Sequence, residues 1–242
     1  MRMKQRTLLT YMVLVNLLLI ALLAAIVIRE GYAGKIVAVV TGRQTPFTQS
    51  VHYRRAVQMQ RQPVSQAMAG SDVLIAFTGD SIIESWLTSA RVPRSMNLGI
   101  SGDTIAGLVA RADPEVIDHI PAWYIGIGVN DALKGRSMEA IAASVARLAA
   151  SYGRAQTLYW SAVLPVAGDR WNDEKEAFRR SLNAHIRKAC LEMENCTFLD
   201  VPEGYTENFP AWSSDGVHPN AEGYLALTRQ ICRHVTCSPE RP

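Results

Sequence analysis

Three residues of this chain have the side chains that a nucleophilic serine site requires. Ser81 lies in the stretch GDSI, directly after an apolar run, and Asp215 and His218 lie together in DGVH. A serine hydroxyl needs a base within hydrogen-bond reach, most often a histidine that a carboxylate orients. Because Asp215 stands three residues before His218, it can accept from Nδ1–H and leave Nε2 to face Ser81. We expect Ser81 as nucleophile, His218 as general base and Asp215 as the acid that orients it.

Attack on an ester carbonyl also requires hydrogen-bond donors aimed at the oxygen that becomes negative. Each such donor lowers the activation free energy by on the order of 3 kcal/mol. The candidates are the backbone N–H of Ser81, the backbone N–H of Gly102 and the side-chain amide of Asn130. A glycine at position 102 lets the backbone approach the substrate without a Cβ in the way. Asp80 and Asp103 are expected to hold the loops through hydrogen bonds to backbone amides.

The apolar pattern of the chain predicts the fold that positions these residues. Short apolar runs predict strands at residues 73–77, 95–98, 123–127, 157–163 and 197–199. Helical spacing predicts helices at residues 82–87, 104–112, 137–152, 173–193 and 220–233. Strands that alternate with helices indicate a parallel sheet covered on both faces, a three-layer α/β sandwich. Ligands bind beyond the carboxyl ends of such strands, which is where the candidate residues stand.

Four motifs in this order resemble those of the SGNH hydrolases, also called GDSL esterases and lipases. They are Ser81 in GDSI, Gly102 in NLGISGDT, Asn130 in GVND and the Asp215–His218 pair, and the likeness spans about residues 72–235. The resemblance implies the flavodoxin-like SGNH hydrolase fold and the five roles given above. It further implies ester hydrolysis through an acyl-enzyme, without a metal or an organic cofactor.

Two details of the motifs bear on the substrate. Ile82 stands where the family name has leucine, and this volume-conserving change should leave the chemistry intact. The stretch GISGDT is similar to that of the small acetyl-ester and thioesterase members of the family. The resemblance therefore favours short acyl groups, above all O-acetyl, on a small-molecule or glycan-linked ester.

Two other functions stay open at this point. An O-acyltransferase acting on envelope polysaccharide would use the same triad, with a sugar hydroxyl in place of water, and the sequence does not separate it from a hydrolase. A catalytically silent binding protein would keep the fold, although the intact Ser81, Asp215 and His218 argue against it. The natural substrate and the oligomeric state are not determined by the sequence.

An uncharged apolar segment stands near the N-terminus. Residues 8–28 hold 21 residues without a charge, and a helix of this length rises about 30 Å, the thickness of a bilayer core. This predicts a single transmembrane helix that contacts the membrane through residues 8–28. Basic residues at positions 2, 4 and 6 favour a cytoplasmic N-terminus and an exported body. The alternative is a signal peptide cleaved near the small residues Gly31 and Ala33.

We therefore expect three parts: residues 1–30 as N-terminal tip and anchor, residues 31–70 as a juxtamembrane connector, and residues 71–242 as the hydrolase domain. Hydrophobic residues make up 48% of the 242 residues, as is typical of a packed domain. The net charge of +3 comes without a basic run, which argues against a nucleic-acid partner.

The four cysteines form two close pairs in the sequence, Cys190 with Cys196 and Cys232 with Cys237. Four cysteines allow three connectivities, and the short loops favour the local one. Their spacing does not match a zinc site. In a periplasm-like compartment they would be disulfides. Together with the apolar segment, they predict a membrane protein whose catalytic domain faces the periplasmic or another extracytoplasmic side.

Overall fold

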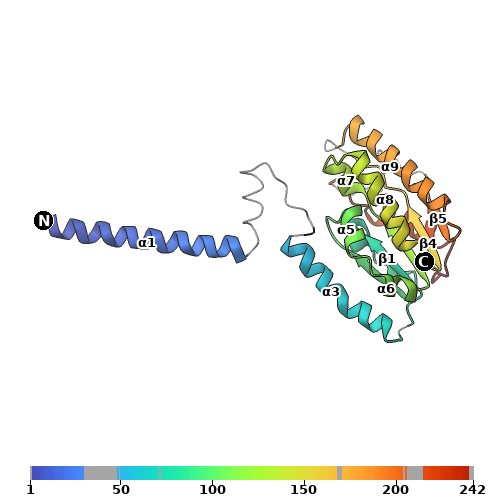
Figure 1. Cartoon of the computed structure of the whole chain (residues 1–242), viewed down its shortest axis with the longest axis horizontal. Helices are drawn as coiled ribbons and strands as arrows, with labels where there is room; N and C mark the ends of the chain where they lie inside the picture. Colours follow the sequence, from blue (N-terminus) through green and yellow to red (C-terminus); the bar gives the residue numbers. More distant parts are fainter. Residues whose placement is uncertain are drawn as a thin grey trace. The chain divides into compact units, whose positions relative to one another are not determined.

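The structure is a computed structural model that describes residues 2–29, 48, 50–70, 72–167, 171–203, 205 and 215–239, with the backbone alone at residues 2–10 and 27–29. The chain divides into two compact units, Met1–Arg55 and Ala56–Pro242 (Figure 1). The first unit contains helix α1 (Arg2–Arg29), and the second contains the sheet and the helices around it.

Helix α1 covers the whole apolar segment, and its described large apolar side chains, such as Leu18 and Leu23, are exposed. Among the described residues, no helix combines the length and the apolarity that a membrane crossing requires. The predicted transmembrane helix at residues 8–28 is therefore not confirmed. Of the expected connector, residues 31–47 and 49 lie outside the described residues, and most of the remainder forms helix α3 (Val51–Met68).

The sheet has five parallel strands in the order β2-β1-β3-β4-β5. Their bounds are β1 Ile75–Gly79, β2 Ser95–Gly99, β3 Ala122–Gly126, β4 Thr157–Ser161 and β5 Cys196–Leu199. Gly79, the last residue of β1, pairs with Gly99 at the end of β2 and with Gly126 at the end of β3. These three neighbouring strands therefore end at one level, and the loops that follow them start side by side. All five strands were expected, with ends shifted by up to two residues.

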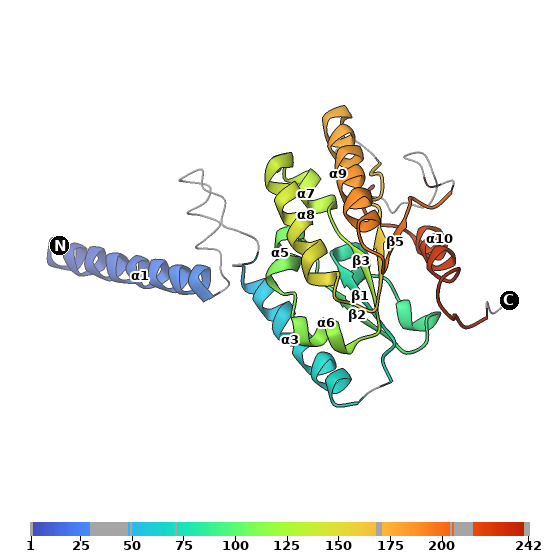
Figure 2. The same cartoon turned by 45° about the vertical axis from the view of Figure 1, so that its right-hand side comes forward.

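Helices cover both faces of this sheet. Figure 2 shows α5 and α8 on one side of the strands and α10 on the other, and α8 also packs against α9. On the second face α10 bonds to α4 and to the segment after it: the Tyr224 hydroxyl donates to the Ile82 carbonyl, and Trp86 Nε1 donates to Thr228 Oγ1. The helix bounds are α4 Ser81–Glu84, α5 Ile105–Ala110, α6 Pro114–His119, α7 Val129–Leu133, α8 Met138–Tyr152, α9 Asp173–Leu191 and α10 Ala221–Ile231, with a 3-10 turn at Thr88–Ala90.

Two prolines stand inside or at the start of helices. Helix α3 continues through Pro63, and Val64, Ala67 and Met68 beyond it pack against the core. Pro114 is the first residue of α6, with Asp113 as the N-cap. Proline is favoured at this first helical position, where its missing N–H has no partner to lose.

Both predicted disulfides are formed. Cys190 is bonded to Cys196, joining the end of α9 to the start of β5, and Cys232 is bonded to Cys237 directly after α10. The local connectivity that the short loops favoured is therefore confirmed.

Candidate active site

Ser81 occupies the sharp turn between β1 and α4. Strand β1 ends at Gly79, Asp80 caps the helix by accepting from Ile82 N at 3.0 Å, and Ser81 is the first helical residue. The side chains of this turn are largely buried, and Ser81 is 8% exposed. The N–H of a first-turn residue has no partner within its helix. Ser81 thus presents both its hydroxyl and its amide at the carboxyl edge of the sheet.

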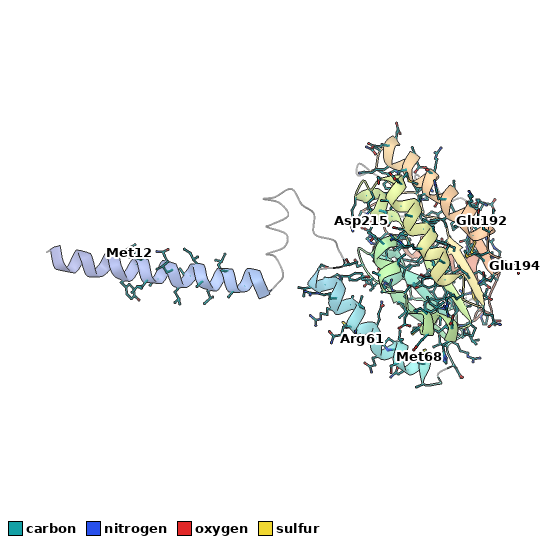
Figure 3. The ribbon with its side chains drawn as sticks, in the orientation of Figure 1. Met12, Arg61, Met68, Glu192, Glu194 and Asp215 are labelled. Carbon is teal, nitrogen blue, oxygen red and sulfur yellow. A yellow bond between two sulfur atoms is a disulfide. The ribbon has the colours of Figure 1, made fainter. Side chains whose placement is uncertain are left out.

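His218 and Asp215 reach Ser81 from the loop before α10. His218 Nε2 lies 2.8 Å from Ser81 Oγ, and His218 Nδ1 lies 2.5 Å from Asp215 Oδ2. Figure 3 labels Asp215. Its second carboxylate oxygen accepts from the amides of Val217 and His218, both at 3.0 Å. A carboxylate beside Nδ1 favours the tautomer that carries its proton there, which leaves Nε2 to accept from the serine hydroxyl. The structure brings the three predicted triad residues into one chain of hydrogen bonds.

The two other predicted donors lie on the loops that follow β2 and β3. Gly102 has φ +77°, in the left-handed region that a residue with a Cβ rarely adopts. Asn130 Nδ2 donates one hydrogen to the Asp103 carbonyl at 3.0 Å, which places its side chain beside the Gly102 loop. The Nδ2 amide carries a second hydrogen, which is able to donate to a ligand. Asn130 belongs to the first turn of α7, a short helix that the sequence patterns did not indicate.

Each of the loops after β1, β2 and β3 also carries one buried carboxylate. Asp80, Asp103 and Asp131 are 1%, 0% and 0% exposed. The pKa of Asp80 is raised to about 7 and that of Asp131 to about 6, mainly by burial and to a smaller extent by the neighbouring carboxylates. Burial also raises the pKa of Asp103, although the Arg111 guanidinium opposes this shift. The loop-holding roles expected of Asp80 and Asp103 agree with their bonds to the amides of Ile82 and Thr104, but Asp131 was not predicted.

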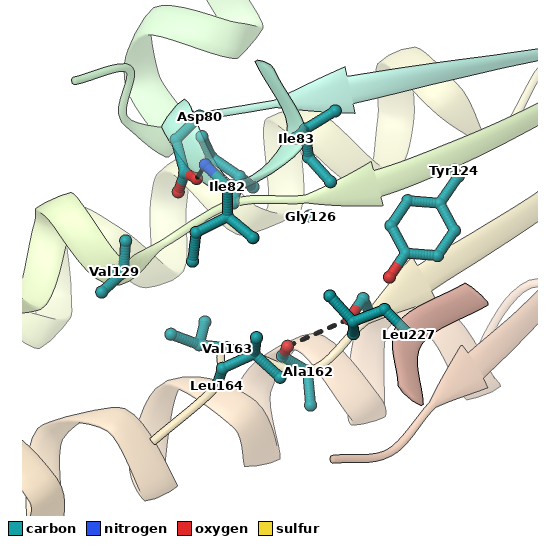
Figure 4. A pocket seen from close by; sticks show the side chains of 12 residues that line it. Asp80, Ile82, Ile83, Tyr124, Gly126, Val129, Ala162, Val163, Leu164 and Leu227 are labelled. Carbon is teal, nitrogen blue, oxygen red and sulfur yellow. Dashed lines mark hydrogen bonds between the residues drawn. The ribbon is translucent and has the colours of Figure 1, made fainter. Parts of the chain in front are cut away.

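A small, mostly apolar cavity is lined in part by the residues on either side of Ser81 in the chain. Asp80 and Ile82, the neighbours of Ser81 in the chain, line it together with Val129, Val163 and other mostly apolar residues (Figure 4). Its volume is about 20 Å³, which is enough for one group of the size of a water molecule or a methyl. Among the described residues, no cluster of three or more His, Cys, Asp or Glu has the arrangement of a metal site.

Comparisons with known proteins find similar chains among esterases and lipases. A curated acetylxylan esterase from Geobacillus stearothermophilus is 28% identical over 159 residues, which are 59% of this chain and 72% of that protein. A solved acetylxylan esterase structure from the same organism has a TM-score of 0.57 at 22% identity and covers 72% of this chain and 99% of its own. A GDSL-like lipase structure from Bacteroides thetaiotaomicron has a TM-score of 0.58 at 23% identity, over 74% and 97% of the chains.

The two structural likenesses show the shared fold, and the family follows from the sequence. The profile of the GDSL-like lipase/acylhydrolase family matches residues 77–226, more than half of the chain. This range begins in β1 and ends in α10, so it contains Ser81, Gly102, Asn130, Asp215 and His218. The chain therefore belongs to the GDSL-like lipase/acylhydrolase family, the SGNH hydrolases, and is distantly related to acetylxylan esterase.

Proposed function

We propose that this protein is a serine carboxylester hydrolase and that Ser81, His218 and Asp215 are its catalytic triad. The observation that carries the proposal is the unbroken chain from Ser81 Oγ to His218 Nε2 and from His218 Nδ1 to Asp215 Oδ2, at 2.8 and 2.5 Å. This geometry allows the imidazole to take the serine proton while the carboxylate stabilises the resulting imidazolium.

The proposed reaction has two matched halves. Ser81 Oγ attacks the ester carbonyl carbon, its proton passes to His218 Nε2, and the carbonyl oxygen becomes an oxyanion held by the Ser81 amide, the Gly102 amide and Asn130 Nδ2. The tetrahedral intermediate collapses when His218 gives the proton to the departing alcohol. Water then attacks the acyl-enzyme with His218 as base, and the acid leaves as Ser81 recovers its proton.

We propose short acyl groups, above all acetyl, as the part of the substrate that the enzyme selects. The cavity of about 20 Å³, which Ile82, Val129 and Val163 line, has room for a methyl group, and Ile82 directly follows Ser81 in the chain. The distant relationship to a protein named as an acetylxylan esterase supports an acetylated carbohydrate as the substrate class.

The decisive experiment compares the wild-type protein with Ser81→Ala on p-nitrophenyl acetate. We expect the variant to lose at least about 1000-fold in kcat and to lose labelling by a fluorophosphonate probe, while its thermal unfolding stays that of a folded protein. Ser151→Ala, at the exposed end of α8, is the matched control and should keep full activity. Activity undiminished in Ser81→Ala would refute the proposal, and a folded wild-type protein that neither hydrolyses nor labels would indicate a silent binding protein.

A chain-length series tests the acyl preference. We expect kcat/KM to fall at least about tenfold from the acetyl to the octanoyl p-nitrophenyl ester, because the longer chain exceeds the cavity. Equal values across the series would refute the preference. The same assay with an added glycan acceptor measures acyl transfer against hydrolysis, and predominant transfer would favour the O-acyltransferase.

We further propose that the enzyme works on the periplasmic or another extracytoplasmic side, with its apolar N-terminal segment as the attachment to a membrane. The two disulfides support an oxidising compartment, and exposed apolar side chains of α1 such as Leu18 support the attachment. Protease treatment of intact spheroplasts should digest the protein, and an alkaline carbonate wash should leave it in the membrane fraction unless the segment is cleaved. Full protection from the protease would refute the location.

A further inference from the structure

The three loops around Ser81 are joined to one another by hydrogen bonds. Asp80, on the first loop, accepts from Ile82 N of the same loop, and its own N–H donates to the carbonyl of Gly126, where the third loop begins, at 3.3 Å. Asp131, on the third loop, accepts from Ile105 N at the start of α5, where the second loop ends, at 3.0 Å. The Asp103 carbonyl on the second loop accepts from Asn130 on the third. Each loop is thus held by bonds to another.

Arg111, the residue directly after α5, bonds to two of these segments. Its Nε donates to Asp103 Oδ2 at 2.9 Å, and its Nη2 donates to the Gly79 carbonyl at 3.1 Å. Gly79 is the last residue of the strand that leads to Ser81, and Asp103 directly follows Gly102. One planar guanidinium therefore bonds both the segment that carries the nucleophile and the loop that carries an oxyanion donor.

The Arg111–Asp103 ion pair is buried, so the loss of either partner would disturb the structure around it. The Arg111 side chain is 9% exposed and that of Asp103 is 0% exposed, so water replaces neither partner. Asp103 Oδ1 is also engaged, since it accepts from Thr104 N at 2.8 Å. Removing the cation from a buried pair leaves an uncompensated carboxylate, which must take up a proton or move toward water. Either response disturbs the loop next to Gly102.

We propose that Arg111 is a positioning residue for the oxyanion hole, one that holds the Gly102 loop at the correct distance from Ser81 through Asp103 and the Gly79 carbonyl. This inference rests on the proposed ester hydrolysis and adds a residue that the catalytic motifs do not contain. Electrostatic stabilisation of an oxyanion requires donors that are already in place, and a displacement of about 1 Å in such a site costs about 100-fold in rate. Arg111 acts on the transition state without touching the substrate.

The test uses Arg111→Lys and Arg111→Gln in the full chain. A lysine ammonium lacks the planar fork that spans two acceptors, so both variants should fail to hold both segments. We expect kcat on p-nitrophenyl acetate to fall about 10- to 100-fold, more for glutamine than for lysine, with KM within about threefold of the wild-type value. The inhibition constant of a small alkylboronic acid, which forms a tetrahedral adduct with Ser81, should rise in step with the loss in kcat.

Arg154 provides the matched control. It pairs with Asp118 through two hydrogen bonds, but the two side chains are 52% and 45% exposed and lie outside the site. Arg154→Lys and Arg154→Gln should therefore keep the wild-type kcat and boronate affinity. If the Arg111 variants have a lower melting temperature but unchanged kcat and unchanged boronate inhibition, Arg111 has a merely structural role and the inference is wrong.

A double variant separates action through Asp103 from general destabilisation. Asp103→Asn combined with Arg111→Gln replaces the buried ion pair by two neutral amides. If Arg111 acts through Asp103, the double variant should lose no more in kcat than the worse single variant, whereas independent roles would multiply the two losses. Multiplied losses would overturn the inference. An inactive wild-type protein overturns the proposed function and this inference with it, while an active wild type with unaffected Arg111 variants overturns the inference alone.

Discussion

The acid–base side and the oxyanion side of this site are held in opposite ways. On the acid–base side, the His218 and Asp215 side chains are 36% and 43% exposed and lie three residues apart in one loop. On the oxyanion side, Asp103 and Asp131 are 0% exposed, and their partners come from separate segments of the chain. The acid–base side is held by contacts within one solvent-exposed loop. The oxyanion side is held by buried contacts between separate segments of the chain.

This difference follows from what each side must do. A general base must exchange protons with substrate and water during each turnover, and a short turn suffices to orient it because Asp215 accepts three hydrogen bonds from within that turn. Oxyanion donors must stay fixed while charge develops, and their strength depends on exclusion of water. We therefore expect substitutions on the acid–base side to remove activity without unfolding the protein. Those beneath the oxyanion donors should alter activity and stability together.

The largest expected effect in this comparison comes from His218→Gln. Glutamine cannot accept the serine proton, so kcat should fall about 1000- to 10,000-fold. The melting temperature should stay close to that of the wild type, because the side chain is partly exposed. Stopped-assay kinetics and thermal unfolding measure the two quantities, and His185→Gln on the exposed face of α9 is the control. A large loss of stability in His218→Gln would contradict the separation of the two sides.

Asn130→Ala should have the next largest effect and should show the coupling on the buried side. It removes a proposed oxyanion donor, which costs about 100- to 1000-fold in kcat, and it also removes the bond to the Asp103 carbonyl. The melting temperature should therefore fall as well. Asn172→Ala removes the N-cap of α9 and should lower stability by about 1 kcal/mol while kcat stays unchanged. Equal kcat in Asn130→Ala and Asn172→Ala would exclude Asn130 from the hole.

The two sides also differ in how far the sequence predicts them. Ser81, Asp215 and His218 were expected in contact because their residue types fit one reaction and the latter two are close in the chain. The five strands were expected because short, largely apolar runs alternate with helical patterns along the chain. Helix α7 was not, since its five residues are too few for a helical pattern to show.

The buried layer beneath the donors has no comparable signal in the sequence. An aspartate is normally exposed, so nothing at position 131 indicates complete burial. The partners of Arg111 lie 8 and 32 residues away in the chain, and their proximity depends on how α5 packs on the sheet. Such contacts arise from tertiary structure, whereas the hydrogen bonds between Asp215 and His218 form within a loop of four residues.

The pH dependence of the free energy of unfolding gives a test of the buried side with a smaller but more specific effect. Because the pKa of Asp80 is about 7 in the folded state and its ordinary value is 3.8, the folded chain binds more protons than the unfolded chain between these values. The contribution of Asp80 to the free energy of unfolding is therefore complete below about pH 4 and is lost as the pH rises to about 7. Each tenfold difference in proton affinity between the folded and unfolded chain corresponds to about 1.4 kcal/mol.

Asp80→Asn should remove this dependence. Relative to the wild type, the variant should gain melting temperature as the pH rises from about 5 to about 8, which a series of thermal melts would measure. Asp118→Asn is the control, because its hydrogen bond to Arg154 lowers the pKa of Asp118. The effect of that substitution should be constant over the same range. A constant difference for Asp80→Asn would show that Asp80 is ionised throughout.

The smallest expected effect is that of Ile82→Leu, which introduces the leucine of the family name next to the nucleophile. Ile82 is 8% exposed and lines the cavity, but its hydrogen bonds to Asp80 and Tyr224 use only its backbone. The side chain keeps its volume, so we expect less than about 1.5 kcal/mol in stability and less than about threefold in kcat on p-nitrophenyl acetate. A change in the ratio of acetyl to butyryl turnover, measured on the same variant, would show that the shape of this side chain selects the acyl group. An unchanged ratio would assign that selection to Val129 and Val163 across the cavity.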